Sequence, residues 1–279
     1  MIEQILFPVD FSPSCAAMAA YVQRVAAIYK SEVTILYVCD LASHSGFELY
    51  ARPGNEIAEE HWNIARSKLD RFLTSELPPA TCRRILSAGD AASVIAQTAK
   101  KNFDLVVMPT HAGRFRRMLL GSTTSKVLDE AECPVLTMQH AETIAPRSLE
   151  HRHWACAIGL SVDSERVLRY AKDAASAAGA KLAVIHAISA DEGRSDPKEV
   201  SQAVRRAHQG VAALQGRVGS QASVGVTVGK VKEALLHAAR ESNADVLVVG
   251  RSPHAHGIGR MRDLTYALIR DSPCPVVSV

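Results

Sequence analysis

Two short stretches of the chain hold polar residues of a kind that binds ligands, and each follows an apolar run. Asp10 comes directly after the apolar residues 5–9 and just before Ser12, a residue suited to cap a helix. A carboxylate in this place can accept hydrogen bonds from a ribose or from an adenine amine. It can equally well cap the positive end of a helix, so the residue alone leaves both roles open.

The second stretch is Thr110–Thr123, which reads THAGRFRRMLLGST and follows another apolar run. Gly113 and Gly121 would let backbone N–H groups approach phosphate oxygens, and Arg114 offers positive charge beside them. A solvated basic loop is the alternative interpretation. The segment is not a Walker loop, because no GK[ST] sequence follows its glycines.

Both stretches lie where the sequence predicts that buried strands end. Nearly continuous apolar runs such as VTILYV, DLVVM and DVLVV are typical of strands covered on both faces of a parallel sheet. The predicted strands are Gln4–Val9, Val33–Cys39, Arg83–Ser87, Asp104–Pro109, Pro134–Met138, Trp154–Gly159, Lys181–Ile188, Ser223–Val228, Asp245–Gly250 and Pro275–Val279.

Segments of helical length separate these strands. They are Ser14–Lys30, Ile57–Glu76, Ala91–Lys101, Ser122–Ala131, Ser164–Ala178, Lys198–Gly216, Val231–Ser242 and Asp263–Asp271. Alternating strands and helices predict an α/β fold with a parallel sheet, which binds ligands at the carboxyl ends of its strands. The long irregular segment Asp40–Asn55 is a candidate flap over that edge.

The chain also repeats itself. Asn102–Met138 matches Asn243–Val279 at a constant offset of 141 residues, so that Asp104 falls on Asp245. A duplicated domain predicts an intramolecular pseudo-dimer. We expect a first domain at residues 1–140, a linker at 141–153 and a second domain at 154–279.

Composition limits the classes of function. The chain has 279 residues, of which 47% are hydrophobic and 22% charged, and its net charge of +3 does not favour nucleic acid or membrane binding. Its six cysteines form no CxxC pair, so we expect buried free thiols rather than a metal site, in a cytoplasmic protein. The His-x-His pairs at 151/153 and 254/256 have no identifiable third metal ligand.

The motifs ILFPVDFS, VTILYV, MPTH…RRMLLGSTTSKVL and CPVL resemble the universal stress protein (UspA-like) family in a tandem, two-domain form. The resemblance implies two open five-stranded parallel sheets flanked by helices, of Rossmann-like or adenine nucleotide alpha hydrolase-like type, that pair through their last strands. It also implies binding of ATP or ADP, with or without Mg²⁺. The implied nucleotide-binding residues are Pro8, Asp10, Val38, Met108, Pro109, Gly113, Arg114, Gly121, Ser122 and Thr123.

Within that set, the resemblance implies that Asp10 contacts ribose or base, that Val38 contacts adenine, and that residues 121–123 hold phosphate. The loop departs from the family pattern Gly-x2-Gly-x9-Gly-Ser/Thr, because Pro109 and Ala112 replace its first two glycines. Gly113 compensates if the loop slips by one residue. Proline has no N–H to donate and alanine resists positive φ, so the first site is weakened.

The second half departs further. At an offset of 149 residues Asp10 falls on Gly159, and at 141 Gly121 and Ser122 fall on Arg262 and Asp263. A carboxylate at the phosphate position would repel a nucleotide. We therefore expect a degenerate second site.

The sequence predicts a stress-response protein that binds adenine nucleotide in its first domain and regulates an unknown protein partner. Enzymatic activity is left open, and slow ATP hydrolysis is the most that the sequence predicts. A nucleotide-free scaffold or chaperone-like module is the alternative function. An enzyme related to nucleotide-dependent ligases is a third, against which stands the lack of a complete catalytic set. A further homodimer is also left open.

Overall fold

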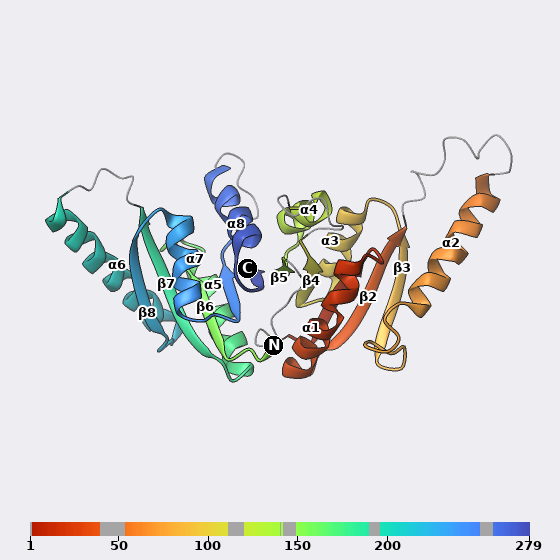
Figure 1. Ribbon diagram of the computed structural model, residues 1–279, viewed down its shortest axis with the longest axis horizontal. Helices are drawn as coiled ribbons and strands as arrows, with labels where there is room; N and C mark the ends of the chain where they lie inside the picture. The colour runs from red at the N-terminus through yellow and green to blue at the C-terminus, as the bar shows by residue number, and fades with distance from the viewer. Residues whose placement is uncertain are drawn as a thin grey trace. The chain divides into compact units, whose positions relative to one another are not determined.

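The computed structural model describes residues 2–39, 54–110, 120–139, 141, 149–189, 196–251 and 259–279, with side chains for all of these except 54–57 and 259–262. Within these residues the chain has the predicted α/β fold, in which a mostly parallel sheet is flanked by helices (Figure 1). The predicted tandem arrangement is confirmed, because strands and helices alternate through both halves. The predicted flap at 40–55 and the histidines at 254 and 256 fall almost wholly outside the described residues.

The first half presents its elements in the predicted order. They are β1 (Gln4–Val9), α1 (Pro13–Tyr29), β2 (Glu32–Cys39), α2 (Gly54–Arg71), β3 (Cys82–Ala88), α3 (Ala91–Asn102), β4 (Leu105–Pro109), α4 (Ser122–Glu130) and β5 (Val135–Met138).

The second half repeats that order. Its elements are β6 (His153–Ala157), α5 (Ser164–Ala177), β7 (Lys181–Ser189), α6 (Pro197–Val218), β8 (Ser223–Gly229), α7 (Val231–Glu241), β9 (Val246–Val249), α8 (Gly259–Asp271) and β10 (Val276–Ser278). The largest difference from the predicted bounds is the end of α2 at Arg71, five residues before the expected Glu76. The helix α8 begins four residues before the expected Asp263.

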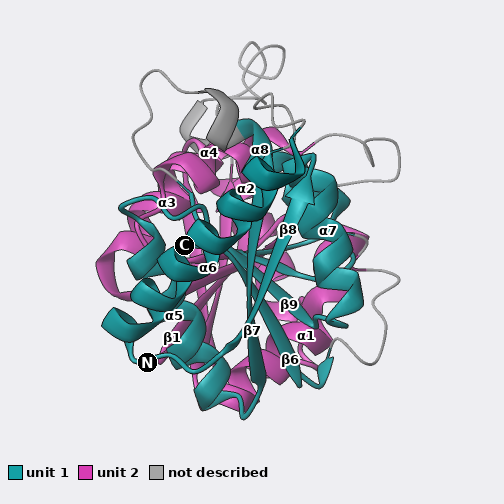
Figure 2. Ribbon diagram, turned by 90° about the vertical axis from the view of Figure 1, so that its left-hand side faces the viewer, with its two compact units in different colours: residues 1, 136–139, 144–279 teal, residues 2–135, 140–143 magenta. Residues whose placement is uncertain are grey.

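The described chain divides into two compact units, distinguished by colour in Figure 2. One unit is built on Ile2–Val135 and orders its strands β3-β2-β1-β4. The other contains residues 136–139 together with the second half, and orders its strands β5-β10-β9-β6-β7-β8. The strand β5 therefore packs beside β10, although the sequence repeat assigns it to the first half. The predicted domain limits at residues 140 and 154 stay predictions.

The central strands β1 and β4 form the core of the first half. Ile5, Leu6 and Phe7 are fully buried, as are Val106 and Val107, because helices cover both faces of a parallel sheet. The helices α1 and α3 pack on these strands (Figure 1). Burial of both faces explains why the strands read as unbroken apolar runs.

A carboxylate, buried at Asp245 and partly buried at Asp104, fixes the amino end of the central strand in each half. Asp104 Oδ2 accepts hydrogen bonds from the N–H groups of Glu3 and Gln4 at 2.7 and 2.9 Å. Asp245 Oδ2 accepts hydrogen bonds from the N–H groups of Arg152 and His153, at the start of β6, both at 2.8 Å. The repeated Asp104 and Asp245 therefore hold the fold together at the edge opposite to the carboxyl ends of the strands.

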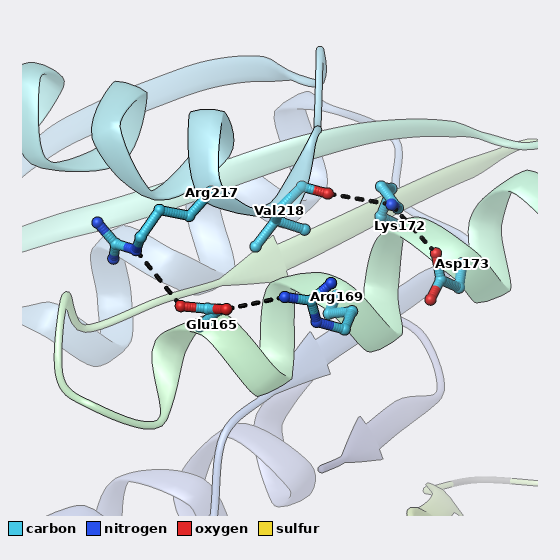
Figure 3. Close-up of polar contacts among 6 residues, drawn as sticks. All are labelled: Glu165, Arg169, Lys172, Asp173, Arg217 and Val218. Carbon is cyan, nitrogen blue, oxygen red and sulfur yellow. Dashed lines mark hydrogen bonds and ion pairs between the residues drawn. The ribbon is translucent and has the colours of Figure 1, made fainter.

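In the second half, ionic and polar contacts join α5 to α6 (Figure 3). Glu165 pairs with Arg169 at 2.8 Å and with Arg217 at 3.3 Å. The Nζ atom of Lys172 donates to the carbonyl of Val218, the last residue of α6, over 3.1 Å. A cation at this place also complements the negative carboxyl end of the helix.

Candidate nucleotide site of the first half

The carboxyl ends of β1, β2 and β4 lie side by side. β1 pairs in parallel with β2 on one side and with β4 on the other, so the order of strands reverses beside β1. An open α/β sheet forms its ligand crevice where this reversal occurs, because the loops from the two neighbouring strands diverge there. The topology therefore directs attention to the loops after Val9 and after Pro109.

A cavity of about 240 Å³ lies at this point. Eight of the predicted nucleotide-binding residues line it, namely Pro8, Asp10, Val38, Met108, Pro109, Gly121, Ser122 and Thr123. The remaining two, Gly113 and Arg114, lie outside the described residues. The structure thus brings together every predicted residue that it describes, although the outermost of them, Pro8 and Thr123, are 115 residues apart in the chain.

Sequence reasoning missed the other residues of the lining, which are Val9, Cys15, Leu36, Tyr37, Ala91, Ile95 and Thr124. A signal existed for Thr124, because it falls on Thr265 in the repeat. Both hydroxyls make the same contact: Thr124 Oγ1 donates to the Pro109 carbonyl at 3.2 Å, and Thr265 Oγ1 to the Gly250 carbonyl at 3.1 Å. The apolar residues of the lining can be located at the cavity only once the pairing of the strands is known.

Asp10 is held through one of its two carboxylate oxygens. Its Oδ1 atom accepts a hydrogen bond from the Ser12 N–H at 2.9 Å, which forms a tight turn closed by the side chain, and a second from Cys15 Sγ at 3.1 Å. The other oxygen, Oδ2, has no hydrogen-bond partner among the residues that the structure describes. Asp10 is exposed, so Oδ2 can accept hydrogen bonds from a ligand.

The residue after Asp10 has an unusual backbone conformation. Phe11 has φ of 60°, in the left-handed region that a bulky side chain seldom adopts. Its ring packs against Tyr37 at 4.3 Å and Phe72 at 5.2 Å between centroids, and these contacts offset the backbone strain. The second half keeps the conformation at Leu160, with φ of 57°. The turn that presents residue 10 is therefore part of the fold.

The N-terminus of α4 forms another part of the cavity lining. Gly121 occupies the N-cap position and no side chain caps the helix. Its own N–H donates to the Thr110 carbonyl at 2.9 Å, which fixes the entry to the helix. The first N–H groups of a helix have no partner within it and carry partial positive charge, so Ser122 and Thr123 present an anion-binding end to the cavity.

The ionisable groups beside Asp10 are kept in their neutral forms. Burial, followed by the charge of Asp10, raises the pKa of the Cys15 thiol to about 12. Burial also raises the pKa of Tyr37, with smaller contributions from Cys39 and Asp10. Cys15 is thus a protonated hydrogen-bond donor at neutral pH rather than a nucleophile, since the thiolate is the reactive form.

The corresponding cavity of the second half measures about 110 Å³ and is lined by Gly159, Ser161 and Ser164, among others. Gly159 supplies no side chain where the first half has Asp10. Because α8 begins at Gly259, Asp263 lies within that helix instead of at its N-terminus, and it is not part of the cavity lining. The predicted repulsion of phosphate by Asp263 therefore has no basis in the described cavity.

The described residues contain no group of three or more His, Cys, Asp or Glu side chains arranged to hold a metal ion. None of the helices in the described ranges is both long and apolar enough to cross a membrane.

Comparison with known proteins gives consistent matches. Universal stress protein MJ0531 of Methanocaldococcus jannaschii is 27% identical over 146 residues, which cover 50% of this chain and 83% of that protein. A universal stress protein from Archaeoglobus fulgidus has a similar structure, with a TM-score of 0.67, 23% identity and coverage of 99% of this chain and 97% of that one. The functionally unknown protein PA1789 from Pseudomonas aeruginosa follows with a TM-score of 0.65, 16% identity and coverage of 100% and 92%.

At these identities the two structural matches show the fold. The family is shown by the model of the universal stress protein family, which matches residues 1–139 and again residues 151–279. The chain therefore belongs to the universal stress protein family and carries two of its domains in tandem.

Proposed function

We propose that the first half of the chain binds an adenine nucleotide, ATP or ADP, and that the protein acts as a nucleotide-dependent regulator. One observation carries the proposal. A single cavity is lined by Asp10, whose Oδ2 has no hydrogen-bond partner among the described residues, by the N-terminus of α4, and by apolar side chains. A nucleotide has the three matching parts, because it consists of ribose hydroxyls, an anionic phosphate chain and an apolar base.

Each part of the nucleotide would have its own contact. The ribose hydroxyls would donate to Asp10 Oδ2, and the base would lie against Val38, Met108 and Ile95. The phosphates would accept hydrogen bonds from the N–H groups at the start of α4. Asp10 is the one acidic residue in the described lining, so Mg²⁺ would be held mainly by the phosphates themselves. A regulator that turns over slowly suits this arrangement better than a fast hydrolase.

The test is a titration of nucleotide-stripped protein with ATP and ADP by isothermal calorimetry. Asp10→Asn removes the charge that accepts the ribose hydrogen bonds and should weaken ATP binding by about tenfold or more. The matched control is Asp163→Asn in the second half, where the acidic side chain also lines a cavity but caps no helix N–H. That control should leave the affinity unchanged.

Absence of heat at millimolar nucleotide for the wild-type protein would contradict the proposal. A loss of affinity in Asp163→Asn alone would instead move the site to the second half. The alternative function, a nucleotide-free scaffold for a protein partner, is favoured by Pro109, which lines the cavity but has no N–H to offer a phosphate. It would be supported if the protein bound no nucleotide.

A further inference from the structure

The thiol of Cys15 fixes the orientation of the carboxylate at the cavity. Cys15 is 2% exposed and lies in the first turn of α1, with its backbone N–H bound to the Ser12 hydroxyl at 3.3 Å. Its Sγ atom donates to Asp10 Oδ1 over 3.1 Å, and that oxygen also accepts from the Ser12 N–H. A carboxylate held at Oδ1 from two sides has little freedom to rotate. Its second oxygen is thereby directed away from the turn.

The second half of the chain provides an independent comparison. At the offset of 149 residues that places Gly159 on Asp10, Cys15 falls on Ser164. Ser164 is 4% exposed and is the first residue of α5, and Cys15 likewise lies in the first turn of α1. Its hydroxyl lies 3.4 Å from Ser161 Oγ, so it turns back to the loop. The half without the carboxylate thus also lacks the thiol.

We propose that Cys15 is a positioning residue that presents Asp10 Oδ2 to the ribose hydroxyls and so makes the site selective for a ribonucleotide. The inference rests on the nucleotide site proposed above. Cys15 needs no chemistry of its own for this role. It needs only to keep its proton, which burial and the neighbouring carboxylate ensure at neutral pH.

The experiment compares ATP with 2′,3′-dideoxy-ATP, which lacks both ribose hydroxyls, by calorimetry on the full-length protein. The wild type should bind ATP more tightly. Cys15→Ala should weaken the binding of ATP by about fivefold, as expected for loss of one orienting hydrogen bond. It should leave the affinity for the dideoxy compound unchanged. Cys15→Ser, which keeps a donor, should recover most of the ATP affinity. Ser164→Ala removes the matched hydroxyl of the second half and should change neither affinity.

The ratio of the two affinities separates positioning from general damage to the fold. If Cys15→Ala weakened the binding of both compounds by the same factor, or changed neither affinity, Cys15 would not position Asp10 and the inference would be overturned. Equal binding of the two compounds by the wild type would overturn it as well, while leaving nucleotide binding intact. If the wild type bound neither compound, the proposed function itself would fail, and the inference with it.

Discussion

Carboxylates at opposite ends of the strands serve different purposes. Asp104 and Asp245, at the amino ends of β4 and β9, accept hydrogen bonds from backbone N–H groups of a neighbouring strand. Asp10, at the carboxyl end of β1, satisfies only one oxygen locally. The repeat kept the first pair and lost the counterpart of Asp10 at Gly159. The carboxylates that the two halves share therefore support the fold, whereas Asp10, which the second half lacks, is not needed for it.

Asp245→Ala should destabilise the protein by about 3 kcal/mol, because it removes a carboxylate, 2% exposed, that accepts hydrogen bonds from the N–H groups of Arg152 and His153. Asp104→Ala should cost less, since that carboxylate is only partly buried and water can replace it. Urea unfolding at pH 7 measures both values. As a control, Asp173→Ala on the exposed face of α5 should fall within about 0.5 kcal/mol of the wild type. If Asp245→Ala lowered the free energy of unfolding by no more than the control does, the structural role of Asp245 would be refuted.

At the scale of single residues, the sequence identified the polar groups of the site but little of what holds them. Asp10 and Gly121–Thr123 were found because their types and their places after strands indicate ligand binding. Cys15 was assigned as a buried thiol without a role, because its contact with Asp10 depends on the first turn of α1 and on a strained residue at position 11. Such a turn has no signature in composition or periodicity.

At the scale of elements, the two halves anchor their helices by related contacts. Gln23 on α1 donates through Nε2 to the Glu76 carbonyl beyond α2, and the matching Lys172 on α5 donates to the Val218 carbonyl at the end of α6. The second half adds the Glu165 pairs drawn in Figure 3, whereas the first half has Ala16 in that position. The helices that flank β7 and β8 are therefore joined by charge as well as by apolar packing.

A second ionic contact joins α7 to α8 and should make the stability depend on pH. Hydrogen bonds from Arg270, and then from Lys232, lower the pKa of Asp271 to about 2. Since the folded pKa lies below that of the unfolded chain, about 3.9, the stabilisation is present above that value and is lost as the pH falls toward 2. At pH 7, Asp271→Asn should cost about 1 kcal/mol, since the group is partly exposed.

The measurement is urea unfolding of the wild type and of Asp271→Asn between pH 7 and pH 3. The difference in free energy of unfolding between the two proteins should shrink as the pH falls. A difference that stayed constant over this range would show that the Asp271 carboxylate does not contribute through its charge.

Every strand and helix predicted from the sequence is present, because long apolar runs and clear turn residues define them. The bounds of two helices differ from the prediction. The helix α8 begins at Gly259, four residues before the expected Asp263. In the first half, α2 begins at Gly54 and ends at Arg71, earlier than predicted at both ends. Glycine weakens a helix by only about 1 kcal/mol, so packing of the helix can override it.

At the scale of the whole molecule, β5 belongs by sequence to one half and by packing to the other unit. It lies beside β10, and Thr137 Oγ1 donates to the Val276 carbonyl at 3.4 Å. Repeats in the sequence could predict the duplication and the role of these strands in pairing. They could not predict that residues 136–139 would group with the second half, because that depends on contacts distant in the chain.

Removing β5 should therefore expose an apolar strand edge on β10. A fragment of residues 149–279 should self-associate through that edge, whereas a fragment of residues 134–279 should do so less, because it supplies β5 in its own chain. Light scattering after size-exclusion chromatography distinguishes the two. Monomeric behaviour of both fragments would show that β5 does not protect β10.

Gly159 gives the second half a further property. A side chain begun at this position would meet no atom within 4 Å, and the backbone there is not in the left-handed region. The opposite, amino end of β6 is still held by Asp245, and the turn beside Gly159 keeps the conformation found at Phe11. The second domain therefore has room for a carboxylate at this position. In a chain built this way, a single substitution can add or remove a charged group at one strand end, while the duplicated frame stays unchanged.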